Sequence, residues 1–381
     1  MPLAPGHDSP APHATTGRPW VIDVHCHFTL TARRWNEESP FDFERGPATP
    51  FAAYNSPRHL GRIGQRLARR WIGRGRHLGP DALDARLEAL FLKHLTTFRH
   101  VDRVVLLAFD EVHDDAGRAR GPAGRRRDFG TDMYVSNGFV VQMCRRYADR
   151  FLFGASVHPY RPDALDWLDA VVRAGAVLMK WLPPAHNIDA DDTRVMAFLR
   201  RCHAHRLPLL VHYGPEFTLT THNRRAEDPR PMFHALRRLR AEKCMPTVIV
   251  AHVATPLLGP FTNDSAFRSL LAALTGEFAD APLYADIAAL AAPSKIHGFR
   301  TILRTPAVWP KLVYGSDFPI PCVPAAFRDR LGPRYRCVAA ERNWIDRDVL
   351  LKRAVGLPDD VFTRAAGLLR LPSDGGGPDR G

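Results

Sequence analysis

The sequence of 381 residues lacks any apolar run near the length of about 18 residues that a membrane-spanning helix needs. It also has few cysteines: the six are scattered, and none forms a Cys-x-x-Cys pair. The N-terminal residues lack the basic start and apolar stretch of a secretory signal. We therefore expect a cytoplasmic protein with reduced thiols and no membrane partner.

Lysine is scarce as well. Only six of the 53 basic residues are lysine, although the formal net charge is +13. This arginine bias, beside many Ala, Pro and Gly residues, is typical of a GC-rich coding sequence and does not by itself indicate a nucleic-acid surface. The densest arginine cluster, 118–127, lies in a Gly/Pro-rich stretch without interleaved aromatic residues. We expect a solvated loop there, no nucleic-acid partner, and a small-molecule substrate that is anionic.

What the sequence does contain is an alternation of short β-branched runs with segments of helical periodicity. We predict strands at 20–24, 101–109, 151–157, 176–181, 208–211, 247–251, 283–287 and 311–314. Helices are predicted between them, at 82–98, 134–147, 162–174, 192–205, 231–242, 265–275 and 293–301. Eight alternating units predict an α/β fold, a single (β/α)8 TIM barrel.

The barrel is predicted to occupy residues 19–372 as one domain. Residues 29–81 are too many for a simple loop, so we expect a helical insertion or lid over the barrel mouth after the first strand. Its basic stretch 62–74 is interpreted as a solvated helix face. Residues beyond about 333 predict extra C-terminal helices outside the barrel. Composition predicts a disordered leader at 1–18 and a disordered tail at 373–381.

The first predicted strand ends in two histidines separated by one residue. Residues two apart on an extended backbone point the same way, so His25 and His27 can converge on one point. Active sites of such barrels are built at the C-terminal strand ends. The other strand ends carry further metal-capable side chains: Lys180, His212, His252 and Asp317. One histidine of 18 means little, but this joint pattern predicts a metal site.

The chemistry explains these residue types. Neutral imidazole and carboxylate suit zinc and similar divalent ions. A catalytic site leaves one position for water, whose pKa the metal lowers to about 7. Asp317 is expected to ligate the metal, to accept the water's proton, or both. His252 is expected to polarise the substrate or to stabilise a developing oxyanion.

The order His-x-His, Lys, His, His and Asp along a barrel resembles the amidohydrolase superfamily. The stretches 154–159 (GASVHP), 180–183 (KWLP) and 314–319 (YGSDFP) are similar to its amidohydrolase-related branch. That branch includes aminocarboxymuconate-semialdehyde decarboxylase and TIM-barrel metal-dependent hydrolases. The resemblance covers about residues 20–325. It implies that His252 acts on water or substrate and that four residues hold one divalent metal: His25, His27, His212 and Asp317.

Lys180 keeps several interpretations open. In binuclear members of that superfamily, the lysine at this place is carboxylated and bridges two metals, and His212 and His252 could hold the second ion. In mononuclear relatives the lysine stays an amine and can bind a substrate carboxylate. A lysine salt-bridged inside the barrel mouth is the third interpretation. We favour one ion, because the local sequence matches the mononuclear branch. Zinc (Zn2+) is the preferred metal, with Mn2+ or Fe2+ as alternatives.

Weaker signals come from residues beside the strand ends. Trp181, Tyr213 and Glu216 are predicted to line the substrate pocket, with ordinary packing or capping as the equal alternative. His158 ends the third strand and is a pocket candidate for which a structural role is the stronger interpretation. Asp286, near the end of the seventh strand, could hydrogen-bond a ligand histidine.

The leading hypothesis is a metal-dependent hydrolase, in which metal-bound hydroxide attacks the carbonyl of an amide, ester or lactone. The first alternative is a nonoxidative decarboxylase of an unsaturated or aromatic carboxylic acid, which needs a cationic clamp and an apolar or aromatic wall. The second is a catalytically inactive binding subunit. Against it, none of the expected site residues is replaced. Dimers are frequent in the family that this sequence resembles, so the resemblance also implies a possible homodimer.

Overall fold

The structure is a computed structural model that describes residues 18–35, 50–216, 218–257 and 263–371. The predicted leader at 1–18, apart from Arg18, and the whole predicted tail at 373–381 therefore lie outside the described residues. Arg18 donates to the Asp102 carboxylate over 2.6 Å. None of the described helices is long and apolar enough to cross a membrane.

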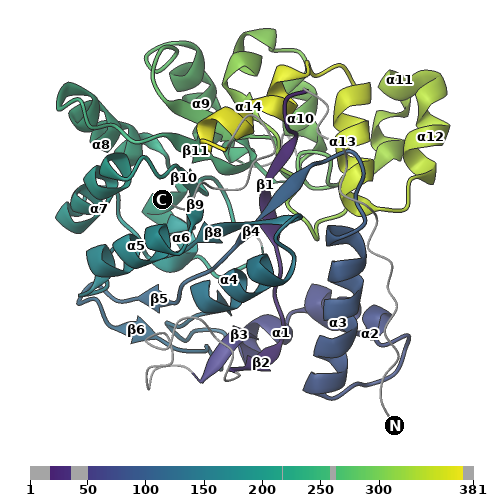
Figure 1. The fold of residues 1–381 in the computed structure, drawn as a ribbon, viewed down its shortest axis with the longest axis horizontal. Coiled ribbons are helices and arrows are strands. Elements are labelled where there is room, and N and C mark those ends of the chain that lie inside the picture. The colour runs from purple at the N-terminus through teal and green to yellow at the C-terminus, as the bar shows by residue number, and fades with distance from the viewer. Residues whose placement is uncertain (1–17, 36–49, 217, 258–262, 372–381) are drawn as a thin grey trace.

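Eight parallel strands form the central sheet (Figure 1). In sheet order they are β1 (Ile22–His27), β4 (Arg103–Leu107), β8 (Phe151–Ala155), β9 (Ala176–Trp181), β10 (Leu209–Val211), β11 (Val248–Val250), β12 (Leu283–Asp286) and β13 (Leu312–Val313). The sheet closes on itself, because the Val24 amide donates to the Tyr314 carbonyl and the His27 amide to the Phe318 carbonyl. The predicted (β/α)8 barrel is confirmed, and each predicted strand overlaps one of these eight.

Helices follow the strands in alternation and cover the outside of the barrel (Figure 1). They are α3 (Pro80–Leu95), α4 (Asn137–Arg146), α5 (Ala164–Arg173), α7 (Thr193–Ala204), α8 (Arg230–Ala241), α9 (Ser265–Thr275), α10 (Ile296–Ile302) and α14 (Asp360–Leu368). Short elements fill the connections: α6 (Pro183–His186), η2 (Arg224–Glu227), η3 (Ala251–Ala254) and η5 (Pro306–Lys311). The helices predicted beyond about residue 333 are present as α12 (Tyr335–Ala340) and α13 (Trp344–Ala354), and three short elements precede them: η6 (Pro324–Phe327), α11 (Arg328–Leu331) and η7 (Gly332–Arg334).

The inside of the barrel is filled by one apolar cluster to which nearly every strand contributes, with Ile22, Val24, Val105, Leu107, Leu152, Leu178, Leu210, Ile249 and Val313 among its members. A β-bulge between Asp23 and Cys26 interrupts the alternation of β1. The inward face therefore changes from Ile22 and Val24 to His25 and His27, since a bulge adds one residue and turns the later side chains of the strand to the other face. His25 and His27 share a face through their spacing, as predicted, and the bulge turns that face into the barrel.

The insertion after β1 differs from the predicted helical layer. Besides α1 (Pro57–Leu60) and α2 (Ile63–Ile72), it contains β2 (Ala32–Arg34) and β3 (Phe51–Asn55). These strands pair antiparallel with β7 (Met133–Val135), which lies far along the chain. The predicted helices are present as α1 and α2, but the prediction missed β2 and β3, because short strands take their stability from a partner that the local sequence does not contain. In the arginine-rich stretch 118–127, residues 119–120 form β6 (Ala119–Arg120), which pairs antiparallel with β5 (Val112–His113), whereas 125–127 are exposed and lie in a loop, as predicted.

A buried acid joins the small sheet to the barrel. Tyr54 on β3 donates to Glu111 over 2.7 Å, and Glu111 is 4% exposed. Burial raises the pKa of Glu111 to about 7. A carboxyl whose pKa is higher in the folded than in the unfolded state stabilises the fold at low pH, and that contribution is lost as pH rises from about 4.5 through about 7.

We predict that Glu111→Gln removes this pH dependence. Relative to the wild type, the free energy of unfolding of the variant should rise by on the order of 2 kcal/mol between pH 5 and pH 8. Urea titrations at a series of pH values measure it, with the exposed Glu277→Gln as the control. Parallel curves for wild type and Glu111→Gln would contradict the prediction.

Candidate metal centre

Three predicted ligands meet at the C-terminal mouth of the barrel. The Nε2 atoms of His25 and His27 lie 3.2 Å apart. Asp317 Oδ1 lies 3.5 Å from His25 Nε2 and 3.4 Å from His27 Nε2. The candidate ligand atoms of these three residues all lie within 4.8 Å of one another, so the group could hold a metal ion.

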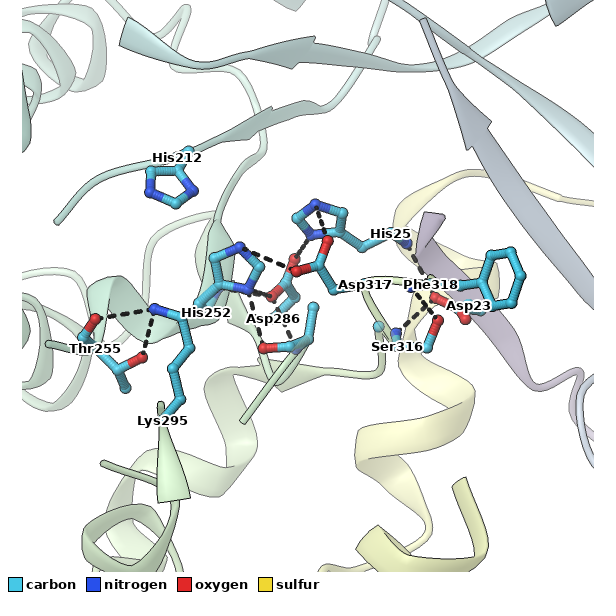
Figure 2. A network of polar contacts seen from close by, with 12 residues as sticks. Asp23, His25, His212, His252, Thr255, Asp286, Lys295, Ser316, Asp317 and Phe318 are labelled. Carbon is cyan, nitrogen blue, oxygen red and sulfur yellow. Dashed lines mark hydrogen bonds and ion pairs between the residues drawn. The ribbon is translucent and has the colours of Figure 1, made fainter. Parts of the chain in front are cut away.

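Asp286 orients two of the histidines (Figure 2). Its Oδ2 accepts from His25 Nδ1 over 2.7 Å, and its Oδ1 accepts from the His252 amide, also over 2.7 Å. With Nδ1 donating, His25 presents the Nε2 lone pair to the centre. The expected contact of Asp286 with a ligand histidine is therefore present, and it has the geometry of a carboxylate that supports a metal-bound imidazole.

The backbone around β1 and after β13 allows His25 and Asp317 to lie close together. Asp23 accepts from the His25 amide and, across the barrel seam, from the Ser316 amide, so it holds the bulge in place. A Cβ on Gly315 would lie only 3.0 Å from the Cβ of His25. Glycine at this position therefore lets the two chains come close. Asp317 itself has a φ of 63°, a left-handed conformation that turns its carboxylate into the mouth.

Burial favours the neutral form of three histidines of the site. It lowers the pKa of His25, His212 and His252 well below the ordinary value, and nearby lysines add to the effect. Burial opposes ionisation of Asp317, but His25, His27 and Lys180 outweigh it and hold the pKa of that carboxyl below its usual range. Neutral imidazoles beside an ionised carboxylate are the donor set that a divalent ion such as zinc accepts.

His252 stands beside the triplet, in the turn that follows β11. Its Nδ1 donates to the Ala288 carbonyl over 2.9 Å, so the neutral ring presents Nε2 as an acceptor. That atom lies 3.9 Å from Asp317 Oδ2. Like Asp317, His252 has a left-handed backbone, with a φ of 53°. Two such conformations at one mouth agree with the tendency of strained backbone to gather at functional sites.

His212 lies in the same cavity but outside the tight triplet. Its ring meets that of His252 edge to face, with centroids 5.1 Å apart. Its Nε2 is buried without a hydrogen-bond partner, although Glu216 Oε2 is 3.4 Å away. No dashed line reaches His212 in Figure 2. A buried, unsatisfied nitrogen is costly, so this lone pair fits a ligand that only a bound ion would complete.

Lys180 lies at the floor of the cavity. Alternation along β9 places it on the same face as Leu178, inside the barrel. It is 1% exposed, and its Nζ is 3.3 Å from His25 Nε2. Burial lowers the pKa of Lys180 to about 8. An amine with that pKa is partly unprotonated near neutral pH, as carboxylation requires, and partly charged, as binding of an anion requires.

The centre forms the floor of a cavity of about 390 Å³. Its upper wall is largely apolar and comes mostly from outside the barrel strands, with Leu60, Ala68, Trp71, Ile72, Leu87, Leu90, Phe91, Leu219, Ile320 and Trp344. The side chains of Asn55, His59, Gln65 and Arg69 add polar groups. The sequence pointed to none of these individually. The only feature of the sequence that indicated a cavity wall was the length of the 29–81 insertion. A wall that is assembled from distant elements has no local sequence motif.

Glu216 lines the cavity, as predicted, whereas the other three predicted pocket residues do not. Trp181 follows the inward Lys180 and so points outward, where it donates to the Val157 carbonyl and packs on Phe198. Tyr213 follows His212 and is buried on the opposite side. His158 is fully buried, with its Nε2 bonded to the His186 carbonyl. Strand alternation explains the first two, and packing explains His158.

Comparisons with known proteins identify no family profile and no curated sequence that matches this chain. Among solved structures, an uncharacterized TIM-barrel protein of Bordetella bronchiseptica is 13% identical, with a TM-score of 0.47 over 88% of this chain and 99% of that one. An amidohydrolase of Burkholderia multivorans with bound zinc is 15% identical, with a TM-score of 0.46 over 93% and 100%. The 5-carboxyvanillate decarboxylase of Sphingomonas paucimobilis is 12% identical, with a TM-score of 0.46 over 93% and 100%. Because these identities and TM-scores are low, they do not establish the family or the activity of this protein. Both are inferred below from the side chains of the site.

The first prediction for this centre concerns metal content. Purified wild type should carry about one divalent ion per chain, and His25→Ala/His27→Ala should carry none, because two of the ligands are gone. Plasma mass spectrometry on tag-free protein measures the ratio. About two ions per chain would point to a carboxylated Lys180, and no ion after incubation with zinc or manganese would contradict the site.

The second prediction concerns the supporting carboxylate. Asp286→Asn should weaken zinc affinity by about 10- to 100-fold, since His25 loses the charged acceptor that fixes its ring. Competition against a chromophoric chelator measures the affinity. The exposed Asp280→Asn is the matched control and should bind zinc as the wild type does. Equal affinity in both variants would remove the role assigned to Asp286.

Proposed function

We propose that this protein is a metal-dependent hydrolase of the amidohydrolase superfamily, in its amidohydrolase-related branch, acting on the carbonyl group of an ester, lactone or amide. The observation that carries the proposal is the meeting of His25, His27 and Asp317 at the floor of a mostly apolar cavity, with His252 beside them. Zinc is the proposed ion, held by this triplet with His212 as the fourth ligand. Such an ion would polarise the carbonyl oxygen and acidify a water molecule.

The two oxygens of Asp317 have different surroundings. Oδ1 lies near His25 and His27, whereas Oδ2 faces His252 Nε2. We assign Oδ2 to accept a proton from the attacking water and to return it to the leaving group. His252 cannot donate from Nε2 while its ring is neutral. We therefore assign His252 to accept a hydrogen bond at Nε2 from Asp317 Oδ2 while that oxygen carries the proton. This role replaces the oxyanion stabilisation expected from sequence.

Lys180 is assigned to the substrate. Its amine is the cation at the floor of the cavity, and it can bind a carboxylate or a carbonyl oxygen of a substrate that enters from the mouth. Glu216 follows β10, the strand next to β9, and its Oε2 lies 3.4 Å from His212 Nε2. An anionic or strongly polar head beside an apolar body therefore suits the cavity, with the reacting carbonyl next to Asp317.

One observation favours a second candidate function. The cavity combines the Lys180 cation with aromatic walls from Phe91, Phe109 and Trp344. This is the combination that a nonoxidative decarboxylase of an aromatic or unsaturated acid requires. A panel assay separates the two: alcohol, amine or ring-opened acid released from nitrophenyl esters, lactones and anilides supports hydrolysis, whereas carbon dioxide released from hydroxybenzoates supports decarboxylation.

We predict that Asp317→Asn abolishes turnover while the fold is kept, because an amide neither accepts the proton nor ligates as a carboxylate does. The rate on the best substrate of the panel should fall by at least about 10³-fold, a typical upper range for loss of a positioned acid–base group. Circular dichroism and thermal melting check the fold, and Asp329→Asn at the surface is the control. Near-normal turnover in Asp317→Asn would exclude this mechanism.

A further inference from the structure

Helix α2 has an exposed apolar face. Ile63, Leu67 and Trp71 are 70%, 64% and 63% exposed, and they recur every fourth residue, so they form one stripe along the helix. No residue of α2 is buried. These are the three most exposed large hydrophobic side chains among the described residues. The basic stretch 62–74 is therefore more than a solvated face, since solvation alone does not favour such a stripe.

The surroundings of this stripe carry charge of one sign. Residues 57–80 contain seven arginines and no acidic residue. Arg66 and Arg70 flank the stripe on α2, and Arg74 and Arg76 follow it, all exposed. Their guanidinium groups have no hydrogen-bond or ion-pair partner within the described part of the chain. The exposed part of α2 thus presents apolar side chains beside unpaired arginines.

The stripe is continuous with the cavity over the metal centre. Trp71 belongs to both, since it lines the cavity and is 63% exposed. Ile320 lines the cavity from beyond β13 and is 40% exposed. Figure 1 shows α2 at the edge of the molecule, beside α3, whose Leu87 and Phe91 form part of the same apolar wall. An apolar path therefore leads from the outer surface toward the catalytic groups.

We propose that α2 docks this protein on an anionic lipid surface, and that the cavity receives a substrate with a long apolar body from that surface. An amphipathic helix with arginines on one face and Trp, Leu and Ile on the other binds at the interface between headgroups and acyl chains. Anionic lipid supplies the charge that the unpaired arginines lack. The substrate part of the inference rests on the proposed function, whereas the docking part does not.

A second copy of the chain is a poorer occupant of this surface. A two-fold interface through α2 would bring two copies of the arginine-rich stretch 57–80 together, since the same patch faces itself. Like charges across an interface oppose association. An anionic membrane has the complementary charge and accepts the exposed aromatic and aliphatic side chains as well.

The test is co-sedimentation of the full chain with vesicles of phosphatidylcholine alone or mixed with phosphatidylglycerol. Binding should appear with the anionic mixture and weaken as NaCl is raised. Ile63→Ser/Leu67→Ser/Trp71→Ser should reduce the partition coefficient by at least about tenfold, through loss of the inserted apolar area. Arg66→Gln/Arg70→Gln should reduce it by about fivefold per arginine. Two surface variants are the matched controls and should bind as the wild type does: Leu165→Ser on α5, and Arg330→Gln/Arg336→Gln.

Three results would overturn the docking proposal. Equal binding to neutral and anionic vesicles, or none to either, would remove the lipid surface as the occupant. A lower oligomeric mass for the triple variant in lipid-free sedimentation velocity would assign the stripe to self-association. A lower melting temperature for the same variant would mean that the chain itself covers the stripe. Since His25→Ala/His27→Ala should still bind anionic vesicles, failure of the docking proposal is distinguishable from failure of the metal-dependent activity.

The substrate part has its own readout. Across nitrophenyl esters of increasing acyl length, kcat/KM of the wild type should rise with chain length and rise further when anionic vesicles are present. Leu90→Ser, which places a hydroxyl in the apolar wall away from the metal centre, should flatten that rise without lowering zinc content. A preference for short acyl chains in both proteins would overturn the assignment of a long apolar substrate.

Discussion

One buried carboxylate holds the centre together. Asp286 accepts hydrogen bonds from the His25 ring, the His252 amide and the Ala288 amide. The first contact decides which nitrogen of His25 faces the cavity, and the other two fix the turn that carries His252. Because burial makes each unmet bond costly, the arrangement is stable only when all three donors are in place. The geometry of the candidate metal centre therefore depends on a residue that does not line the cavity.

The second constraint is closure of the barrel. The amides of Val24 and His27 bind carbonyls beyond β13, and the Asp317 amide binds the His25 carbonyl. These bonds join the first and last strands, which lie at opposite ends of the barrel sequence, and bring Asp317 against His25 and His27. Asp23 and Gly315 serve the same seam, one through hydrogen bonds and the other by lacking a side chain. The ligand set is thus a product of closure rather than of any one motif.

The barrel and its insertion supply different side chains to the site. Strand ends supply the histidine, lysine and carboxylate groups at the floor of the cavity. The insertion and the C-terminal helices supply the apolar walls, from α2 to Trp344. Chemistry and substrate preference can therefore change separately, as is common when function is carried by loops on a shared scaffold. The stripe on α2 belongs to the second part, and it extends the cavity wall to the surface.

The sequence by itself determined the elements whose cause is local. Alternation of apolar runs with helical periodicity predicted the eight strands and the barrel, and strand-end position predicted that His25, His27, Lys180, His212, His252 and Asp317 lie at one mouth. Only the tertiary structure decided the rest. The bulge in β1 and the pairing of β2 and β3 with β7 depend on partners far along the chain. The cavity wall is equally non-local, because helices from several segments share it, and side-chain direction follows from packing that no single segment contains.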